Sequence, residues 1–202
     1  MPAPLKLMVY DRTRSAGRAL ALSWRLGGWL YGRLDRLDAW YGAASWAEAL
    51  EWLTRFRAPE RIGEIQFWGH GHWGSVSIGR DPLDVRALEP AHPWHRSLSA
   101  IRDRLVPGES LWWFRTCETF GRAEGQAFAA AWVKFFGCRA AGHTYVIGPL
   151  QSGLHTLSPG EVPSWPLDEG LPGGNEPRSA RPSLPGSPNT ISFLTGRIPR
   201  GF

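Results

Sequence analysis

Glu64-Ile-Gln-Phe-Trp-Gly-His-Gly-His-Trp-Gly74 is a short apolar run that breaks at glycines flanking two histidines. A second apolar run, Ser110-Leu-Trp-Trp-Phe-Arg-Thr-Cys117, ends in a cysteine about 50 residues after His70. Such runs predict buried strands of an α/β sheet, which presents reactive side chains at the carboxyl ends of its strands. The separation leaves room for the helix that a parallel connection needs, so His70 and Cys117 can meet at one sheet edge.

Cysteine and histidine in this arrangement are typical of nucleophilic catalysis. A thiol attacks as its thiolate, and a nearby imidazole supplies the base for acylation and the acid for the leaving group. The pattern therefore predicts a catalytic dyad of Cys117 and His70, and the alternative for Cys117 is a buried structural cysteine among apolar neighbours. His72 is a competing imidazole, and its alternatives are a contact with loops or substrate and a plain surface position.

The flanking segments alternate between strand and helix patterns. Ser45 and Glu48 form a capping box ahead of an apolar stripe, so a helix begins there and packs on the sheet. The other predicted elements are strands over Leu5–Tyr10, Ile65–Trp68, Leu111–Phe114 and Arg139–Ile147, a helical face of Leu98, Ile101 and Leu105, and a helix from Ala123 to Phe136 that stops at Gly137. This alternation predicts a three-layer α/β domain with a mostly parallel central sheet.

Two segments do not fit the alternation. Residues 18–40 mix Leu, Trp and Arg with three glycines, which would weaken one continuous helix and indicate instead a hairpin or two short elements. Eight of the 17 prolines fall between Ser158 and Asn189. We therefore expect residues 1–157 to form the α/β domain and residues 158–202 to form an extended Pro/Gly-rich arm, in which residues 190–195 can return as an edge strand.

The histidine-glycine after one strand and the cysteine after another resemble the caspase-like cysteine peptidases, which include caspases, metacaspases, clostripain-like enzymes and related bacterial domains. In that fold a His-Gly follows the third core strand and the cysteine follows the fourth, matched here by His70-Gly71 and Cys117. The resemblance covers roughly residues 4 to 155. It implies a caspase-like α/β/α sandwich, a protein or peptide substrate, no cofactor and no need for a third orienting residue.

The resemblance also implies a mechanism. Cys117 Sγ would attack the peptide carbonyl to form a thioester, His70 would move the proton, and the backbone amides of Gly71 and Cys117 would stabilise the oxyanion. Water would then release the acyl-enzyme.

Three further residues are candidates for substrate binding. Arg115 stands two positions before the cysteine, a position that often lines the primary specificity pocket in this family, and its charge suits an acidic P1 residue. The alternative is an arginine that pairs with a nearby acid on the strand edge. Gln151 and Ser152 lie where a substrate loop would form, or in a plain surface loop.

The residues after the cysteine depart from familiar active motifs, because Glu118-Thr119-Phe120-Gly121 replaces a small residue and an immediate glycine. A glutamate beside the thiol would raise its pKa and oppose activation. The alternative function is therefore a catalytically inactive caspase-like scaffold that binds protein partners through its tryptophans and its proline-rich arm. Core packing is the other explanation for the tryptophans.

Composition limits the remaining classes. With 43% hydrophobic residues, 202 residues can bury a substantial core without metal or disulfide support. We expect Cys117 and Cys138 to be reduced thiols in a cytoplasmic protein, because neither a signal peptide nor a repeated Cys pattern indicates an oxidising compartment. No uninterrupted apolar segment approaches the ~20 residues of a bilayer span. The net charge of +5 comes mainly from arginine and would allow contact with nucleic acid or an acidic partner, but no basic run or nucleic-acid motif is present, so nucleic-acid binding is not expected.

Histidines and cysteines also raise a metal hypothesis. His70, His72, His92 and His95, with the two thiols, are suitable zinc ligands when several converge. No CxxC or HExxH framework fixes them on one local scaffold, so no metal site is predicted.

Overall fold

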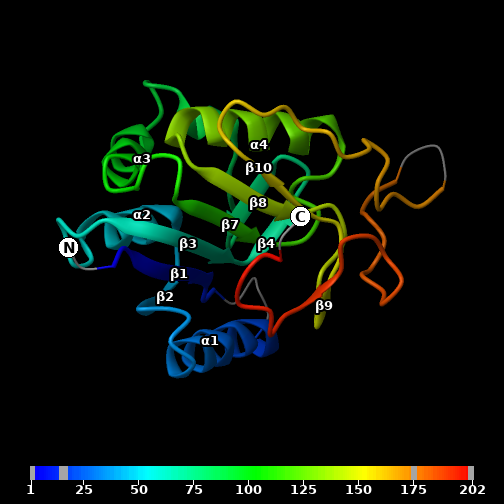
Figure 1. Ribbon diagram of the computed structural model, residues 1–202, viewed down its shortest axis with the longest axis horizontal. Helices are drawn as coiled ribbons and strands as arrows, with labels where there is room; N and C mark the ends of the chain where they lie inside the picture. The colour runs from blue at the N-terminus through cyan, green and yellow to red at the C-terminus, as the bar shows by residue number, and fades with distance from the viewer. Residues whose placement is uncertain (1–2, 14–17, 174–176, 200–202) are drawn as a thin grey trace.

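The computed structural model describes residues 3–13, 18–173 and 177–199 around a six-stranded sheet (Figure 1). The strand order is β10-β8-β7-β3-β1-β2. The strands are β1 (Leu5–Asp11), β2 (Ala39–Ala43), β3 (Ile62–Trp68), β7 (Leu111–Arg115), β8 (Arg139–His143) and β10 (Leu154–Leu157). All neighbouring pairs are parallel except β8 and β10, which are antiparallel. The mixed α/β class and the mostly parallel sheet are therefore confirmed.

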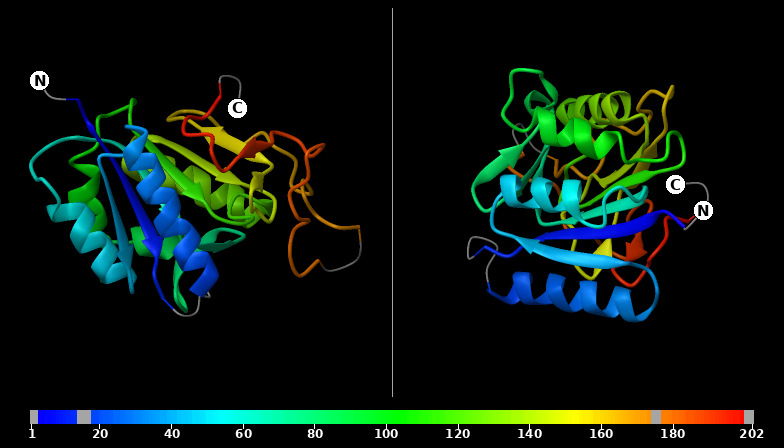
Figure 2. Two further views of the ribbon diagram at one scale, coloured as in Figure 1. Left: turned by 90° about the horizontal axis from the view of Figure 1, so that it is seen from below. Right: turned by 90° about the vertical axis from the view of Figure 1, so that its left-hand side faces the viewer.

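The described residues contain four α-helices, which lie on both faces of this sheet (Figures 1 and 2). They are α1 (Arg18–Arg33), α2 (Trp46–Arg55), α3 (His95–Arg102) and α4 (Arg122–Phe136), with a short 3-10 helix over Val85–Leu88. Leu7 and Val9 of β1 belong to the core beneath α2, α3 and α4, whereas Met8 and Tyr10 belong to a separate cluster with Tyr31 of α1. Side chains alternate between the two faces of a strand, so β1 contributes to both layers.

The core on the α2–α4 face is rich in aromatic rings. Trp112 of β7 meets Trp132 of α4 edge to face at a centroid separation of 4.9 Å. Both side chains are fully buried, as is Trp46 in the same cluster, and Trp113 of β7 is fully buried on the opposite face of the sheet. Offset and edge-to-face aromatic pairs are favourable beyond the apolar area that they bury. These four tryptophans are therefore core residues.

Local sequence signals explain where α2 and α4 begin and end. The Ser45 hydroxyl accepts the Glu48 backbone N–H at the start of α2, and the buried residues of that helix are Trp46, Ala49, Leu50 and Leu53. Gly137 ends α4 in the left-handed conformation, at φ 59°. The strand predicted over Arg139–Ile147 is shorter than expected, because β8 ends at His143.

The structure differs from the expectation of a hairpin or two short elements between residues 18 and 40. Residues 18–33 form one continuous helix, α1. Its glycines allow close packing: a Cβ added to Gly27 would lie 2.8 Å from Trp68 Cζ3, and one added to Gly28 would lie 2.8 Å from Trp40 Cγ. Close packing on two tryptophans offsets the low helix propensity of glycine. No local sequence pattern reveals this packing.

Small sheets flank the main one. A three-stranded antiparallel sheet of β4 (His70–His72), β5 (Ser75–Ile78) and β6 (Asp81–Leu83) follows β3 directly. β9 (Leu150–Gln151) pairs with β11 (Ile191–Ser192), so the predicted strand in the arm joins β9 in a separate two-stranded sheet.

The arm covers the part of the sheet that α1 leaves open. Ile191 is buried in a cluster with Trp113 of β7 and Leu154 of β10, and Ile198 packs against it. Figure 2 shows the last residues of the arm, in red, crossing this region. None of the helices in the described part of the chain is long and apolar enough to cross a membrane.

Candidate active site

The two sequence motifs meet at the carboxyl ends of β3 and β7. These strands are parallel neighbours, with Trp68 opposite Arg115, and His70 and Cys117 each follow that pair by two residues. A Cβ added to Gly71 would lie 2.6 Å from the Cys117 carbonyl oxygen and 2.8 Å from Thr116 Cβ. Only a glycine allows this approach of two backbones. The fold therefore brings the His70 and Cys117 segments into contact.

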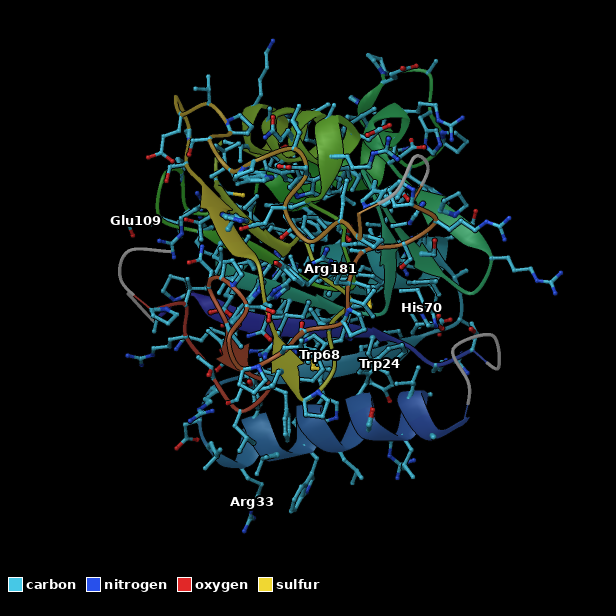
Figure 3. The ribbon with its side chains drawn as sticks, turned by 90° about the vertical axis from the view of Figure 1, so that its right-hand side faces the viewer. Trp24, Arg33, Trp68, His70, Glu109 and Arg181 are labelled. Atoms are coloured by element: carbon cyan, nitrogen blue, oxygen red, sulfur yellow. The ribbon has the colours of Figure 1, made fainter. Side chains whose placement is uncertain are left out.

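His70 lies at the start of β4, where the chain turns out of the main sheet. Its ring is partly exposed and meets Trp24 of α1 edge to face, with centroids 5.7 Å apart (Figure 3). Neither ring nitrogen has a hydrogen-bond partner among the described residues. Both ring nitrogens are therefore available to hydrogen-bond with a ligand or with a neighbouring side chain.

Cys117 is partly buried, and its Sγ lies 3.8 Å from the Ile147 carbonyl oxygen. Burial raises the pKa of the thiol, and the charge of Glu118 raises it further. The Glu118 and Phe120 amides donate to the Tyr145 and His143 carbonyls, whereas the Cys117 amide has no backbone acceptor among the described residues. A hydrogen bond from that N–H to the residue's own Sγ lowers the pKa of the thiol, but by less than burial raises it.

Glu118 is buried beside the cysteine, with a left-handed φ of 44°. Its Oε1 lies 2.6 Å from His72 Nδ1, and its Oε2 accepts the Ser179 hydroxyl at 3.0 Å and the Ala180 backbone N–H. The carboxylate thus joins β4, the turn after β7 and the arm. His72 has a defined structural contact in this arrangement, which favours a loop-orienting role for it.

Arg115 is buried beneath the arm, and all five of its N–H groups have acceptors. Nε and Nη2 donate to Gln151 Oε1 at 3.1 and 2.7 Å, and Nη1 donates to Tyr31 Oη at 2.6 Å. The remaining two donate to the backbone carbonyls of Thr195 and Phe193 at 3.2 and 3.0 Å. The described residues place no carboxylate within ion-pair distance of Arg115. The arginine therefore has neutral partners, and the expected alternative of a paired acid is not seen.

Gln151 and Ser152 lie beneath the arm rather than in a surface loop, and both are buried. Gln151 reaches Arg115, as described above. The Ser152 hydroxyl bonds with Thr190 Oγ1 at 2.7 Å, and its amide donates to Ser183 Oγ at 3.0 Å. A substrate could contact either residue only after the arm moves.

His143, at the end of β8, lies near the site, although the sequence patterns did not assign this imidazole to it. It is fully buried, and its Nδ1 lies 3.1 Å from the Ser152 carbonyl oxygen. Burial, and then the charge of Arg115, lower its pKa to about 3, so the ring is neutral. Its Nε2 is buried without a partner. The available signal was its place at the carboxyl end of a strand next to β7.

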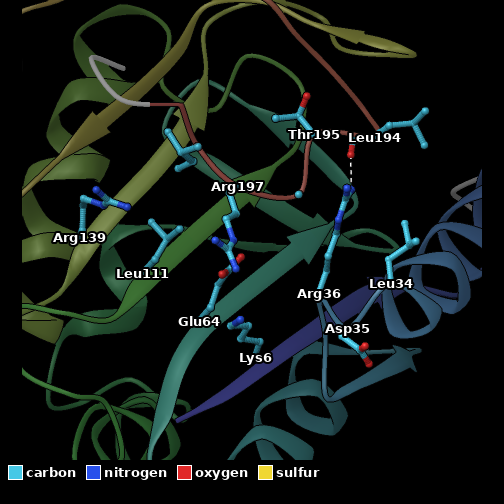
Figure 4. A pocket seen from close by; sticks show the side chains of 12 residues that line it. Lys6, Leu34, Asp35, Arg36, Glu64, Leu111, Arg139, Leu194, Thr195 and Arg197 are labelled. Carbon is cyan, nitrogen blue, oxygen red and sulfur yellow. Dashed lines mark hydrogen bonds between the residues drawn. The ribbon is translucent and has the colours of Figure 1, made fainter. Parts of the chain in front are cut away.

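A cavity of about 810 Å³ lies away from this edge (Figure 4). Its walls include Lys6, Glu64, Leu111 and Arg139, which lie near the amino-terminal ends of four strands, and residues 194–198 of the arm. It is therefore at the opposite end of the strands from Cys117. No group of three His, Cys, Asp or Glu side chains in the described ranges is arranged to hold a metal ion.

No family model and no curated protein sequence matches this chain.

Proposed function

We propose that this protein is a caspase-like cysteine endopeptidase that uses Cys117 and His70. The observation that carries the proposal is the packing of Gly71 against the Cys117 backbone, which joins the two motifs at neighbouring parallel strand ends. The order β2-β1-β3-β7 supports it, because the histidine follows the third strand of the main sheet along the chain and the cysteine follows the fourth. This is the arrangement that the family resemblance implies.

In the proposed reaction, Cys117 Sγ attacks the scissile carbonyl carbon while its proton passes to His70. The oxyanion that forms accepts hydrogen bonds from the Cys117 and Gly71 amides. His70 then protonates the leaving amine, which leaves a thioester on Cys117. A water molecule, deprotonated by His70, hydrolyses the thioester and restores the thiol. Because burial raises the pKa of the thiol, proton transfer to His70 must accompany attack.

The environment of Arg115 supports an acidic P1 residue. A buried guanidinium is costly without a compensating anion, and its acceptors here are an amide oxygen, a phenol and two carbonyls. A P1 carboxylate would replace the Phe193 and Thr195 carbonyls and place a negative charge in direct contact with the guanidinium, which Glu64 influences only from beyond ion-pair distance. Residues 193–195 would have to move by enough to free those two N–H groups.

A second candidate function is an inactive caspase-like scaffold. The observations that favour it are the raised pKa of Cys117 and the complete set of acceptors on Arg115. In this alternative, the arm is a permanent part of the fold and the Cys117 edge binds no substrate.

Labelling by electrophilic peptide probes distinguishes the two functions. Wild type is compared with Cys117→Ala and His70→Ala, using probes with P1 Asp or P1 Ala, and mass spectrometry locates the adduct. The peptidase predicts labelling at Cys117 that prefers P1 Asp and falls about 100-fold or more without His70. Cys138→Ala is the matched control, because that second thiol is buried away from the dyad and its loss should leave labelling unchanged. A folded wild type that no probe labels at Cys117 supports the scaffold.

A further inference from the structure

Helix α1 buries one side against the sheet and leaves large apolar side chains exposed on the other. Gly27 and Gly28 face the protein and are buried against Trp68 and Trp40. Surface helices of globular proteins ordinarily turn their large apolar residues toward the core. In α1, Tyr31 and Trp24 face inward with the two glycines, and further large apolar residues are left on the outside. Packing within the chain does not account for that outer face.

The outer face carries a row of large apolar side chains. Leu22, Leu26 and Trp29 follow one another at helical spacing and are 53%, 54% and 54% exposed. Leu20, near the start of the helix, and Leu34, just beyond its end, are also exposed. Contiguous apolar surface of this kind marks a binding site for a protein or a membrane.

The charged residues of α1 itself are all arginines, and Asp35 follows just beyond its end. No acidic residue occurs between Asp11 and Asp35, and the exposed Arg25 and Arg33 belong to the same outer surface as the leucines. Figure 3 shows Arg33 pointing away from the body of the molecule. The whole chain also has a net charge of +5. The complementary partner is therefore anionic as well as apolar.

The shape of the surface indicates which anionic partner fits. α1 is a single helix on the outside of its layer, so it presents a convex ridge rather than a groove (Figures 1 and 2). A helix with leucine and tryptophan along one side and arginines beside them is typical of segments that lie in the plane of a membrane interface. Tryptophan favours the headgroup level, and arginines pair with anionic lipid.

We propose that the outer face of α1 binds the surface of an anionic lipid bilayer. Leu22, Leu26 and Trp29 enter the boundary between headgroups and acyl chains, while Arg25 and Arg33 contact lipid phosphates. The helix lies parallel to the membrane. Because Trp24 on the same helix contacts His70, the candidate active-site edge is held near the lipid surface. This inference does not depend on the peptidase activity.

Vesicle flotation tests the proposal on the full-length protein. Vesicles of equal parts phosphatidylcholine and phosphatidylglycerol are compared with vesicles of phosphatidylcholine alone, at low and at raised salt. We expect wild type to float with the anionic vesicles, to bind neutral vesicles at least about fivefold less, and to lose binding as salt rises. Arg25→Gln with Arg33→Gln should weaken binding about tenfold or more, as should Leu22→Gln with Leu26→Gln.

Matched controls make the result specific. Leu184→Gln and Val162→Gln remove exposed apolar side chains from the arm and should leave flotation unchanged. All variants should retain the thermal unfolding midpoint of wild type within a few degrees, because the altered residues are exposed. Wild type that floats with neither vesicle, or variants of α1 that float as well as wild type, would overturn the proposal. Self-association that the Leu22/Leu26 variant abolishes, without lipid binding, would overturn it in favour of a second copy of the chain.

Discussion

Acidification should destabilise this protein through His143 before most carboxylates are protonated. The ring is completely buried, and its Nε2 has no acceptor. Burial and the nearby charge of Arg115 lower its pKa from 6.5 to about 3. In the unfolded chain the ring is in water and regains its ordinary pKa. The unfolded state therefore binds a proton that the folded state excludes.

The sign and size of the effect follow from these two pKa values. Between pH 6.5 and about pH 3 the unfolded state holds more protons, so the free energy of unfolding falls as pH falls. The contribution is complete above pH 6.5 and is lost at roughly 1.4 kcal/mol per pH unit below it. From pH 7 to pH 5 the expected loss is about 2 kcal/mol, equivalent to a fall of roughly 4–8 °C in Tm for a chain of this size.

Urea unfolding followed by tryptophan fluorescence measures this loss at pH 7 and pH 5. In His143→Gln the side chain does not titrate, so the pH-dependent loss should be smaller than in wild type by about 2 kcal/mol, whatever the stability of the variant at pH 7. His92→Gln is the matched control and should retain the loss, because it leaves His143 in place. If His143→Gln loses as much stability as wild type over this range, the burial argument is refuted.

Three further substitutions test the contacts around the site and the packing behind it. Glu118→Gln removes the charge beside Cys117, which should lower the pKa of the thiol. The pH profile of Cys117 alkylation by iodoacetamide, followed by mass spectrometry, should therefore shift to lower pH. An unchanged profile would show that Glu118 does not influence the thiol. Arg115→Lys cannot reproduce the planar fork that binds Gln151, Phe193 and Thr195. Limited proteolysis of residues 190–199 should therefore be faster, and the free energy of unfolding should fall by about 3 kcal/mol. Equal cleavage rates in the variant and wild type would count against this contact. Arg104→Met leaves the carbonyls of Leu53, Phe56 and Glu60 without their guanidinium donor. Urea unfolding should show that the free energy of unfolding falls by about 2–3 kcal/mol. A fall below about 0.5 kcal/mol would show that water replaces the guanidinium as the donor to these carbonyls.

The elements that the sequence predicts well are those whose signals are local. The helix after Ser45 has its cap and its apolar stripe within ten residues, and both appear as expected in α2. The strands that precede His70 and Cys117 are short apolar runs, and both are buried as β3 and β7. Periodicity and capping act over one or two turns, so a window of that length contains the information.

The site was predictable only in part. The spacing of the two motifs predicted that His70 and Cys117 share a sheet edge, and the packing of Gly71 on the Cys117 backbone agrees with it. The contacts of Arg115 were not predictable, because Phe193 and Thr195 lie about 80 residues along the chain. The three partners of Glu118 likewise come from β4 and the arm.

By itself, the sequence determined the class of fold, the strands that end near the histidine and the cysteine, and the Pro/Gly-rich, extended character of the arm. Only the tertiary structure decided which face of α1 is buried, where the arm lies and which acceptors Arg115 has. The physical reason is the distance along the chain over which each kind of interaction acts. Backbone preferences depend on neighbouring residues, whereas burial and the partners of a polar side chain depend on segments that are distant in sequence. In α1 the distant segments decide: Trp40 and Trp68 pack against its glycines, Tyr31 is buried beside Trp68, and Leu22 and Leu26 stay outside.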